Sequence, residues 1–195
     1  PKNPKNTRNL KNPKAKPEEY SYNLADIDME RDKSYYYLFQ EENNNINKNS
    51  PGLFILLVDQ TFAMQGEALI NLKDSLKKLL AILPKGSYYQ LIGFHTFYTM
   101  YNETPVEYNQ ENYLNSIDQI NGMKAEGLTN ILDPLFEVYL NGRYNHIDLP
   151  RFIIMLTDGQ VNNADECLEL IEKNNYFFTV HAVGIGENLN QEFIR

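Results

Sequence analysis

The sequence of 195 residues contains one cysteine, Cys167, so it can form no internal disulfide. A disulfide-dense secreted scaffold is therefore excluded, and we expect an intracellular, cytoplasmic protein. No apolar run approaches the roughly 20 residues of a membrane-spanning helix. No apolar segment follows the basic first residues, as it would in a signal peptide. We therefore expect no membrane span and no secretory leader.

The sequence also lacks the usual motifs of catalytic sites. The run Gly184-Ile185-Gly186 begins like a dinucleotide fingerprint, but the third glycine is absent and the run does not follow the first strand. The histidines are scattered, and no serine or cysteine nucleophile motif lies near any of them. We expect no catalytic residue, and hence a protein that is not an enzyme.

Positive charge is scarce outside the first seventeen residues. Residues 1–17 carry six basic groups and no acid, and because the whole chain carries −8, residues 18–195 carry −14. A phosphate-binding surface needs clustered Lys and Arg, so the acidic body excludes nucleic acid as its ligand. The proline-rich residues 1–17 are expected to be an extended basic arm. Such an arm either contacts an acidic partner surface or links to a preceding domain.

Apolar patterning divides the remaining chain into two parts, residues 18–50 and residues 51–195. In the first part, alternating residues over Tyr20–Glu30 and an aromatic run over Ser34–Gln40 predict a β-hairpin, followed by a polar linker. In the second part, six apolar residues from Leu53 to Val58 predict a strand buried on both faces. Further strands are expected over 88–94, 97–101, 151–157 and 177–183, and helices over 65–83, 110–120, 131–140, 164–173 and from about 190. This alternation predicts an α/β fold with a doubly wound, mostly parallel sheet and helices on both faces.

Oxygen-bearing side chains follow the predicted strands at one edge of this sheet. Asp59 and Thr61 come directly after the first strand, Thr129 opens a later helix, and Asp158 ends another strand. Ligand sites of open α/β sheets lie at the carboxyl ends of the strands. Carboxylates and hydroxyls without His or Cys suit a hard cation such as Mg²⁺.

The order of these motifs resembles a von Willebrand factor type A domain. The resemblance covers Pro51 to Arg195 and rests on three motifs in order. These are an apolar strand followed by Asp-x-Thr-x-Ala-Met, then Gly-x-Thr-Asn, then an apolar strand followed by Thr-Asp-Gly. Such domains carry a metal-ion-dependent adhesion site of the form Asp-x-Ser-x-Ser with a distant Thr and a distant Asp. The resemblance implies a non-catalytic protein-interaction module of a larger protein or assembly. It also implies four metal ligands, namely Asp59, Thr61, Thr129 and Asp158.

The sequence departs from that motif at two positions. Ala63 stands where the second serine would be, and a methyl group cannot bind a metal. Phe62 replaces the glycine that many intracellular relatives have there. The site therefore either binds Mg²⁺ weakly, with a water in place of the serine, or is vestigial. Phe62 either contacts a partner or folds back into the space left by the serine. The resemblance places the partner-binding residues around this site: Phe62, Gln60, Leu128, Asn130 and Gln160.

Two alternatives to a partner-binding module stay open. One is a purely structural subunit of a large complex whose adhesion face is unused, and the other is a Mg²⁺-dependent enzyme acting through Asp59 and Asp158. The segment Tyr20–Gln40 is similar in position to the end of the β-rich domain that precedes such modules in the inter-alpha-trypsin-inhibitor-type family. That family's last helix and a sixth strand would follow Arg195, so we expect a C-terminally incomplete domain.

Overall fold

The computed structural model describes residues 50–140, 142–186 and 189–194. The basic arm expected over residues 1–17 and the hairpin expected over Tyr20–Gln40 lie outside the described residues. Both stay predictions, as does the expectation of a further helix and strand after Arg195.

Among the described residues, six strands form one sheet in the order β3-β2-β1-β5-β6, with β4 also paired to β2. The pairings β1–β2, β1–β5 and β5–β6 are parallel, whereas β3 and β4 run antiparallel to β2. The sheet is therefore mostly parallel, with β1 at its centre and two short antiparallel strands at one edge. The strands are β1 (Leu53–Asp59), β2 (Tyr88–Phe94), β3 (Tyr98–Met100), β4 (Val106–Glu107), β5 (Arg151–Thr157) and β6 (Thr179–Gly184).

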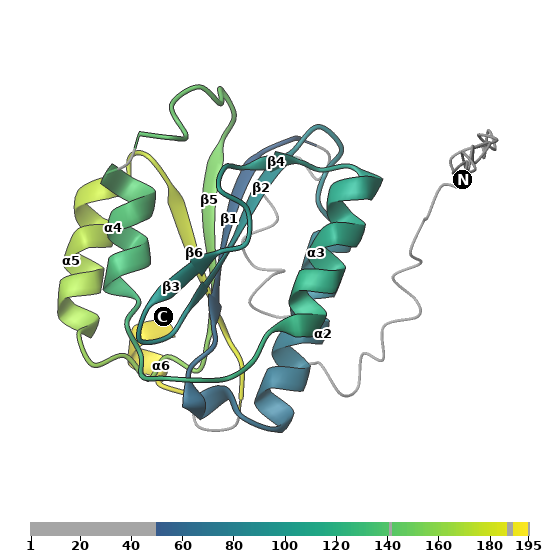
Figure 1. Cartoon of the computed structure of the whole chain (residues 1–195). Helices are drawn as coiled ribbons and strands as arrows, with labels where there is room; N and C mark the ends of the chain where they lie inside the picture. Colours follow the sequence, from purple (N-terminus) through teal and green to yellow (C-terminus); the bar gives the residue numbers. More distant parts are fainter. Residues whose placement is uncertain (1–49, 141, 187–188, 195) are drawn as a thin grey trace, which may run out of the picture.

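Helices cover both faces of this sheet (Figure 1). One layer holds α2 and α3, which pack against each other, and the opposite layer holds α4 and α5. The helices are α2 (Glu67–Ala81), α3 (Gln110–Gly122), α4 (Leu132–Leu140), α5 (Ala164–Asn174) and the short α6 (Gln191–Ile194), with a 3₁₀ turn, η2 (Phe62–Met64), after β1. The doubly wound fold predicted from the sequence is confirmed.

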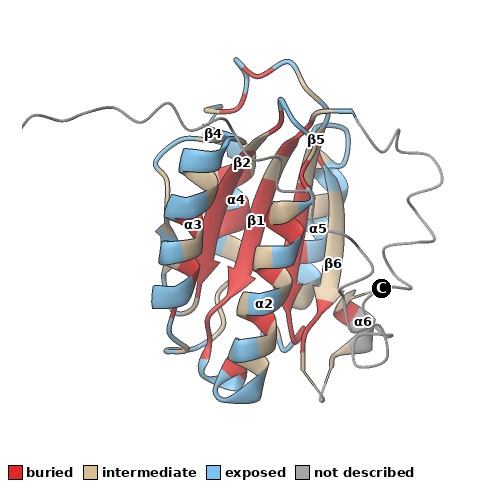
Figure 2. Cartoon of the chain, turned by 90° about the vertical axis from the view of Figure 1, so that its right-hand side faces the viewer, coloured by how far each residue is buried: buried red, intermediate tan, exposed pale blue. Residues whose placement is uncertain are grey.

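Strand β1 is buried on both faces because its residues alternate between two cores. Leu53, Ile55 and Leu57 pack in the core beneath α4 and α5. Leu56 and Val58 pack in the core beneath α2 and α3. Every residue of β1 except the half-buried Phe54 is buried, whereas the edge strand β6 is only partly covered (Figure 2). A continuous apolar run is what a strand between two helical layers requires.

Apart from shifts of one or two residues at other element ends, the structure differs from the expected elements at β4 and at the starts of α2 and β6. Strand β4 was not expected, because a two-residue strand is too short to carry a periodic signal. Helix α2 begins at Glu67 and not at residue 65, because Gln65 follows η2 in an extended conformation and Gly66 has a φ of 78°. Strand β6 begins at Thr179, because the preceding residues belong to the turn that follows α5.

Candidate functional site

Asp59 is the last residue of the central strand, and its side chain is fully buried. One carboxylate oxygen, Oδ1, accepts hydrogen bonds from the Thr61 hydroxyl at 2.7 Å and from the Thr61 N–H at 3.0 Å. The other oxygen, Oδ2, accepts from the Thr157 hydroxyl at 2.7 Å. Thr61 and Thr157 therefore fix the orientation of the Asp59 carboxylate at the carboxyl edge of the sheet.

Burial raises the pKa of Asp59 above its ordinary value. The hydrogen bonds from Thr157 and Thr61 oppose that shift, and the negative charge of Asp158 adds to it. A cation held by Asp59 and Asp158 would oppose this rise in the pKa of Asp59, because a nearby positive charge favours the ionised carboxylate.

Asp158 follows β5 and is the second carboxylate of the site. It is almost fully buried, and its Oδ1 accepts a hydrogen bond from the Gln160 N–H at 2.9 Å. The preceding Thr157 accepts from the Gly159 N–H at 3.0 Å while it donates to Asp59. Thr157 is a site residue that our ligand set did not include. The signal was in the sequence, because Thr157 belongs to the Thr-Asp-Gly motif.

Thr129 lies on the loop before α4 and is half-buried. Within the described residues, no hydrogen bond joins its side chain to Asp59 or Asp158. The loop is held by its neighbours, since the Leu128 N–H donates to the Thr96 hydroxyl at 2.9 Å. Gly127 permits this approach, because its φ is 73° and a Cβ there would lie 2.6 Å from the Thr96 hydroxyl oxygen.

Three large apolar side chains are exposed on the loops of this edge. Phe62, Leu128 and Phe97 are 55%, 70% and 72% exposed. Hydrogen bonds join the three loops, because the Phe62 N–H donates to the Gly127 carbonyl at 3.0 Å and the Leu128 N–H donates to the Thr96 hydroxyl at 2.9 Å. We call Phe62, Phe97 and Leu128 the strand-end residues. Phe62 does not fold back into the protein, and Phe97, which we had expected at the start of a strand, precedes β3 on an exposed turn.

Two residues expected to face a partner have structural roles instead. Gln60 is 4% exposed, and its side chain exchanges hydrogen bonds with the Tyr101 hydroxyl across Gly93. The prediction of a partner-facing Gln60 therefore needs correction. The Asn130 side chain donates to Asp133 Oδ2 at 2.7 Å and accepts from the Asp133 N–H at 3.4 Å, so it caps the start of α4. Gln160 is exposed, as expected.

The oxygen ligands at this edge fit a hard cation only in part. Asp59, Thr61 and Asp158 supply two carboxylates and a hydroxyl, whereas Ala63, exposed in η2, supplies nothing. The described residues contain no group of three or more His, Cys, Asp or Glu side chains placed to hold a metal. Mg²⁺ binds through a few carboxylates and keeps several waters, so the arrangement is compatible with weak binding.

Other residues considered from the sequence have structural surroundings. Cys167 is buried, and burial raises the pKa of its thiol to about 12. His181 is half-buried and stacks on Phe152, with 6.3 Å between the ring centroids. Within the described ranges, every helix is too short or too polar to cross a lipid bilayer.

No protein-family model matches the chain. Curated relatives nevertheless align over about three quarters of the chain. A von Willebrand factor A domain-containing protein of Dictyostelium discoideum is 31% identical over 144 residues, which are 72% of this chain and 7% of the relative. The human von Willebrand factor A domain-containing protein 5B1 is 29% identical over 149 residues, 76% of this chain and 12% of the relative. The bovine inter-alpha-trypsin inhibitor heavy chain H3 is 28% identical over 155 residues, 74% of this chain and 17% of the relative. The chain thus spans less than a fifth of the length of these relatives.

Solved structures have the same fold. A von Willebrand factor type A protein from Catenulispora acidiphila has a TM-score of 0.65 at 17% identity, over 75% of this chain and 36% of that one. The manganese-loaded TRAP protein of Plasmodium vivax has a TM-score of 0.62 at 22% identity, over 75% of this chain and 62% of that one. At these identities the likeness shows the fold alone.

Proposed function

This chain contains a von Willebrand factor type A domain, and we propose that it is a non-catalytic protein-interaction module that binds its partner through the carboxyl edge of the sheet. The observation that carries the proposal is the exposure of the strand-end residues around a buried carboxylate site. Exposed large aromatic side chains in such a position are typical of contact sites.

The shape of the proposed contact surface follows from the loops. Phe62 and Leu128 are expected to supply apolar contact area. Hydrogen bonds join their loops to each other and to the turn at Thr96, so little conformational entropy is lost on binding. Phe97 extends the surface on the next loop. Gln160 and the small exposed part of Asp158 supply polar contacts. The buried Gln60 is not part of the proposed contact surface.

We further propose that the cation site of this module is degenerate. Asp59, Thr61, Thr129 and Asp158 would hold Mg²⁺ weakly, with water in the place of a ligand at Ala63. The TRAP protein of similar fold is manganese-loaded, which supports a divalent cation in a domain of this fold. A partner that binds through Phe62 and Leu128 has no need of the metal, so binding is expected to persist in EDTA.

The proposal includes a setting for the module. Because the chain spans a small part of its curated relatives, we expect it to act within a larger protein or assembly. We place that assembly inside the cell, on the same grounds of cysteine usage as above. The basic residues 1–17 can contact an acidic surface of the assembly, and that contact would weaken with salt.

The test is a co-purification with the full chain in four forms. The baits are the wild type, Phe62→Ala, Leu128→Ala and the control Leu114→Ala, and the bound proteins are quantified. Leu114 is exposed on α3, away from the proposed surface. We expect one partner to be lost from Phe62→Ala and Leu128→Ala and kept by Leu114→Ala. An aromatic side chain at the centre of a contact contributes about 2 kcal/mol or more to the free energy of binding. The affinity of the partner for Phe62→Ala should therefore fall roughly 30-fold. A partner kept by all variants would favour the structural-subunit alternative.

A further inference from the structure

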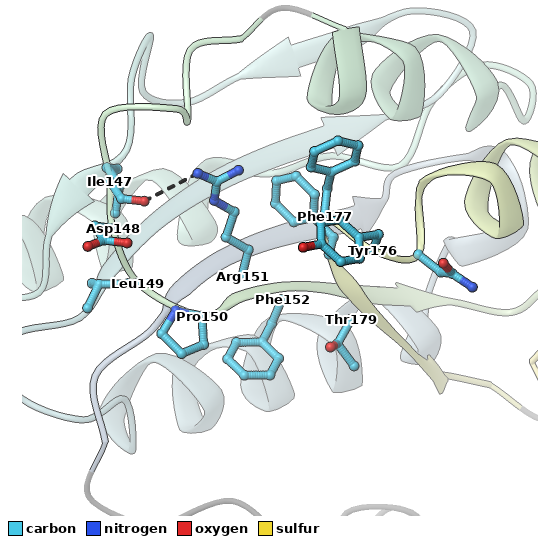
Figure 3. A pocket seen from close by; sticks show the side chains of 11 residues that line it. Ile147, Asp148, Leu149, Pro150, Arg151, Phe152, Tyr176, Phe177 and Thr179 are labelled. Carbon is cyan, nitrogen blue, oxygen red and sulfur yellow. Dashed lines mark hydrogen bonds between the residues drawn. The ribbon is translucent and has the colours of Figure 1, made fainter.

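A second surface feature lies at the opposite, amino edge of the sheet. A cavity of about 380 Å³ is formed by the turn that leads into β5 and the turn between α5 and β6 (Figure 3). Arg151 and Phe152, the first residues of β5, point to opposite faces of the strand, and Tyr176 and Phe177 stand on the facing turn. None of these residues belongs to the carboxyl edge on which the proposed function depends.

The aromatic residues of this cavity are exposed to an unusual degree. Tyr176 is 91% exposed and Phe177 is 56% exposed, and their rings form an edge-to-face pair at 5.7 Å. Phe178, the next residue, turns inward and is buried. A surface turn gains nothing in stability from two aromatic rings in water, so this pair indicates a surface that another segment covers.

Arg151 gives the cavity a positive charge. Its Nη2 donates to the Ile147 carbonyl at 3.4 Å (Figure 3). Its guanidinium lies 5.9 Å from the centre of the Phe178 ring. Among the described residues, no carboxylate forms an ion pair with it. The cavity therefore combines aromatic surface with a guanidinium that forms no ion pair among the described residues, although the carboxylate of Asp148 also lines the cavity.

The preceding part of the chain joins the domain beside this cavity. The Leu53 N–H donates to the carbonyl of Pro150, which lines the cavity, at 2.8 Å. A Cβ on Gly52 would lie 3.0 Å from the ring of Phe152, another lining residue. The 49 residues that precede Ser50 are therefore attached to the domain next to the cavity.

We propose that the amino-edge cavity is the docking site of the chain's own residues 34–40, the run SYYYLFQ. This run holds three tyrosines, a leucine and a phenylalanine, which suit the rings of Tyr176 and Phe177. It is followed directly by Glu41 and Glu42, whose negative carboxylates could form an ion pair with Arg151. The docking uses a different edge from the proposed partner site and goes beyond the proposed function.

The geometry of the chain allows this docking. About ten residues separate residue 40 from Pro51, and such a length reaches up to roughly 35 Å when extended. Because the run is tethered so near the cavity, its effective concentration there is in the millimolar range. Even a contact too weak to hold a separate peptide would then be occupied most of the time.

Hydrogen exchange on the full chain tests the proposal. In the wild type, the amides of residues 34–40 should exchange at least about tenfold more slowly than those of residues 1–17, after correction for intrinsic rates. The double variant Tyr176→Ala/Phe177→Ala should lose most of that protection. The control Leu114→Ala removes an exposed apolar side chain from α3, outside both proposed surfaces, and should keep the protection.

Two results would overturn the proposal. Equal exchange of residues 34–40 in the wild type and the double variant would mean that the cavity does not hold this run. Protection that rises with protein concentration, together with a dimer in sedimentation, would identify a second copy of the chain as the occupant. Urea titration of the double variant checks that the domain stays folded.

Discussion

Restoring one hydroxyl gives the sharpest test of the degenerate cation site. Ala63 lies in η2, two residues after Thr61, and is exposed, so a serine at this position displaces no packed atom. The turn is anchored by the buried Met64, whose N–H donates to the Thr61 carbonyl at 3.0 Å. The variant Ala63→Ser therefore adds a neutral ligand beside the carboxylates with little change elsewhere.

The expected gain in Mg²⁺ affinity follows from the binding free energy that a neutral oxygen ligand contributes. Such a group contributes on the order of 1–2 kcal/mol. This corresponds to a dissociation constant for Mg²⁺ that is about 5- to 30-fold lower, since 1.4 kcal/mol is tenfold. Protons compete with the cation for Asp59, whose pKa burial raises, so the affinity should also fall as the pH is lowered.

Calorimetry with Mg²⁺ and Mn²⁺ measures this gain on wild type, Ala63→Ser and the control Ala81→Ser. Ala81 ends α2, outside the loop that carries the site, so the control should bind metal as the wild type does. No gain for Ala63→Ser would mean that Phe62 or the loop conformation has closed the site. Saturable wild-type binding tighter than about 0.1 mM that Asp59→Ala removes would refute the reasoning, because the site would then not be degraded.

Two further predictions concern stability. Truncating the fully buried Leu56 to Ala should cost about 2–4 kcal/mol by cavity formation, seen as a lower urea midpoint at unchanged slope, whereas Leu128→Ala should change the midpoint little. Equal midpoints would mean that β1 is not the centre of the core. For Asp59, a raised folded-state pKa means that its contribution to stability is present below the unfolded-state pKa and is lost as the pH rises through the folded-state value. The stability of Asp59→Asn relative to wild type should therefore increase from pH 4 to pH 7, and a constant difference over that range would contradict the raised pKa.

Much of the fold could be predicted because the strongest patterns come from its most buried parts. The run from Leu53 to Val58 is apolar throughout, since β1 lies between two helical layers, and this run marks the centre of the sheet. The positions of Asp59 and Asp158 follow from their strands, because Asp59 is the last residue of β1 and Asp158 directly follows β5. The short strand β4 could not be predicted, because two residues paired to β2 depend on tertiary contacts and not on local pattern.

The details of the site depended on contacts that the sequence does not encode locally. Gln60 lies between two expected site residues, yet its side chain reaches Tyr101, 41 positions later, across the space that Gly93 leaves free. Asn130 follows the expected ligand Thr129 but caps α4. Conversely, the exposure of Phe97 depends on the turn between β2 and β3, which no periodic pattern describes.

The two proposed sites lie at opposite ends of the same strand and can be occupied together. Arg151 opens β5 beside the aromatic cavity, and Asp158 follows its last residue at the cation site. Seven residues at about 3.3 Å each place the two ends roughly 20 Å apart. A segment docked at the amino edge therefore leaves Phe62 and Leu128 free for a partner. We expect Phe62→Ala to lose the partner and to keep the protection of residues 34–40. We expect Tyr176→Ala/Phe177→Ala to keep the partner and to lose that protection. Both results together would establish that the two surfaces act independently.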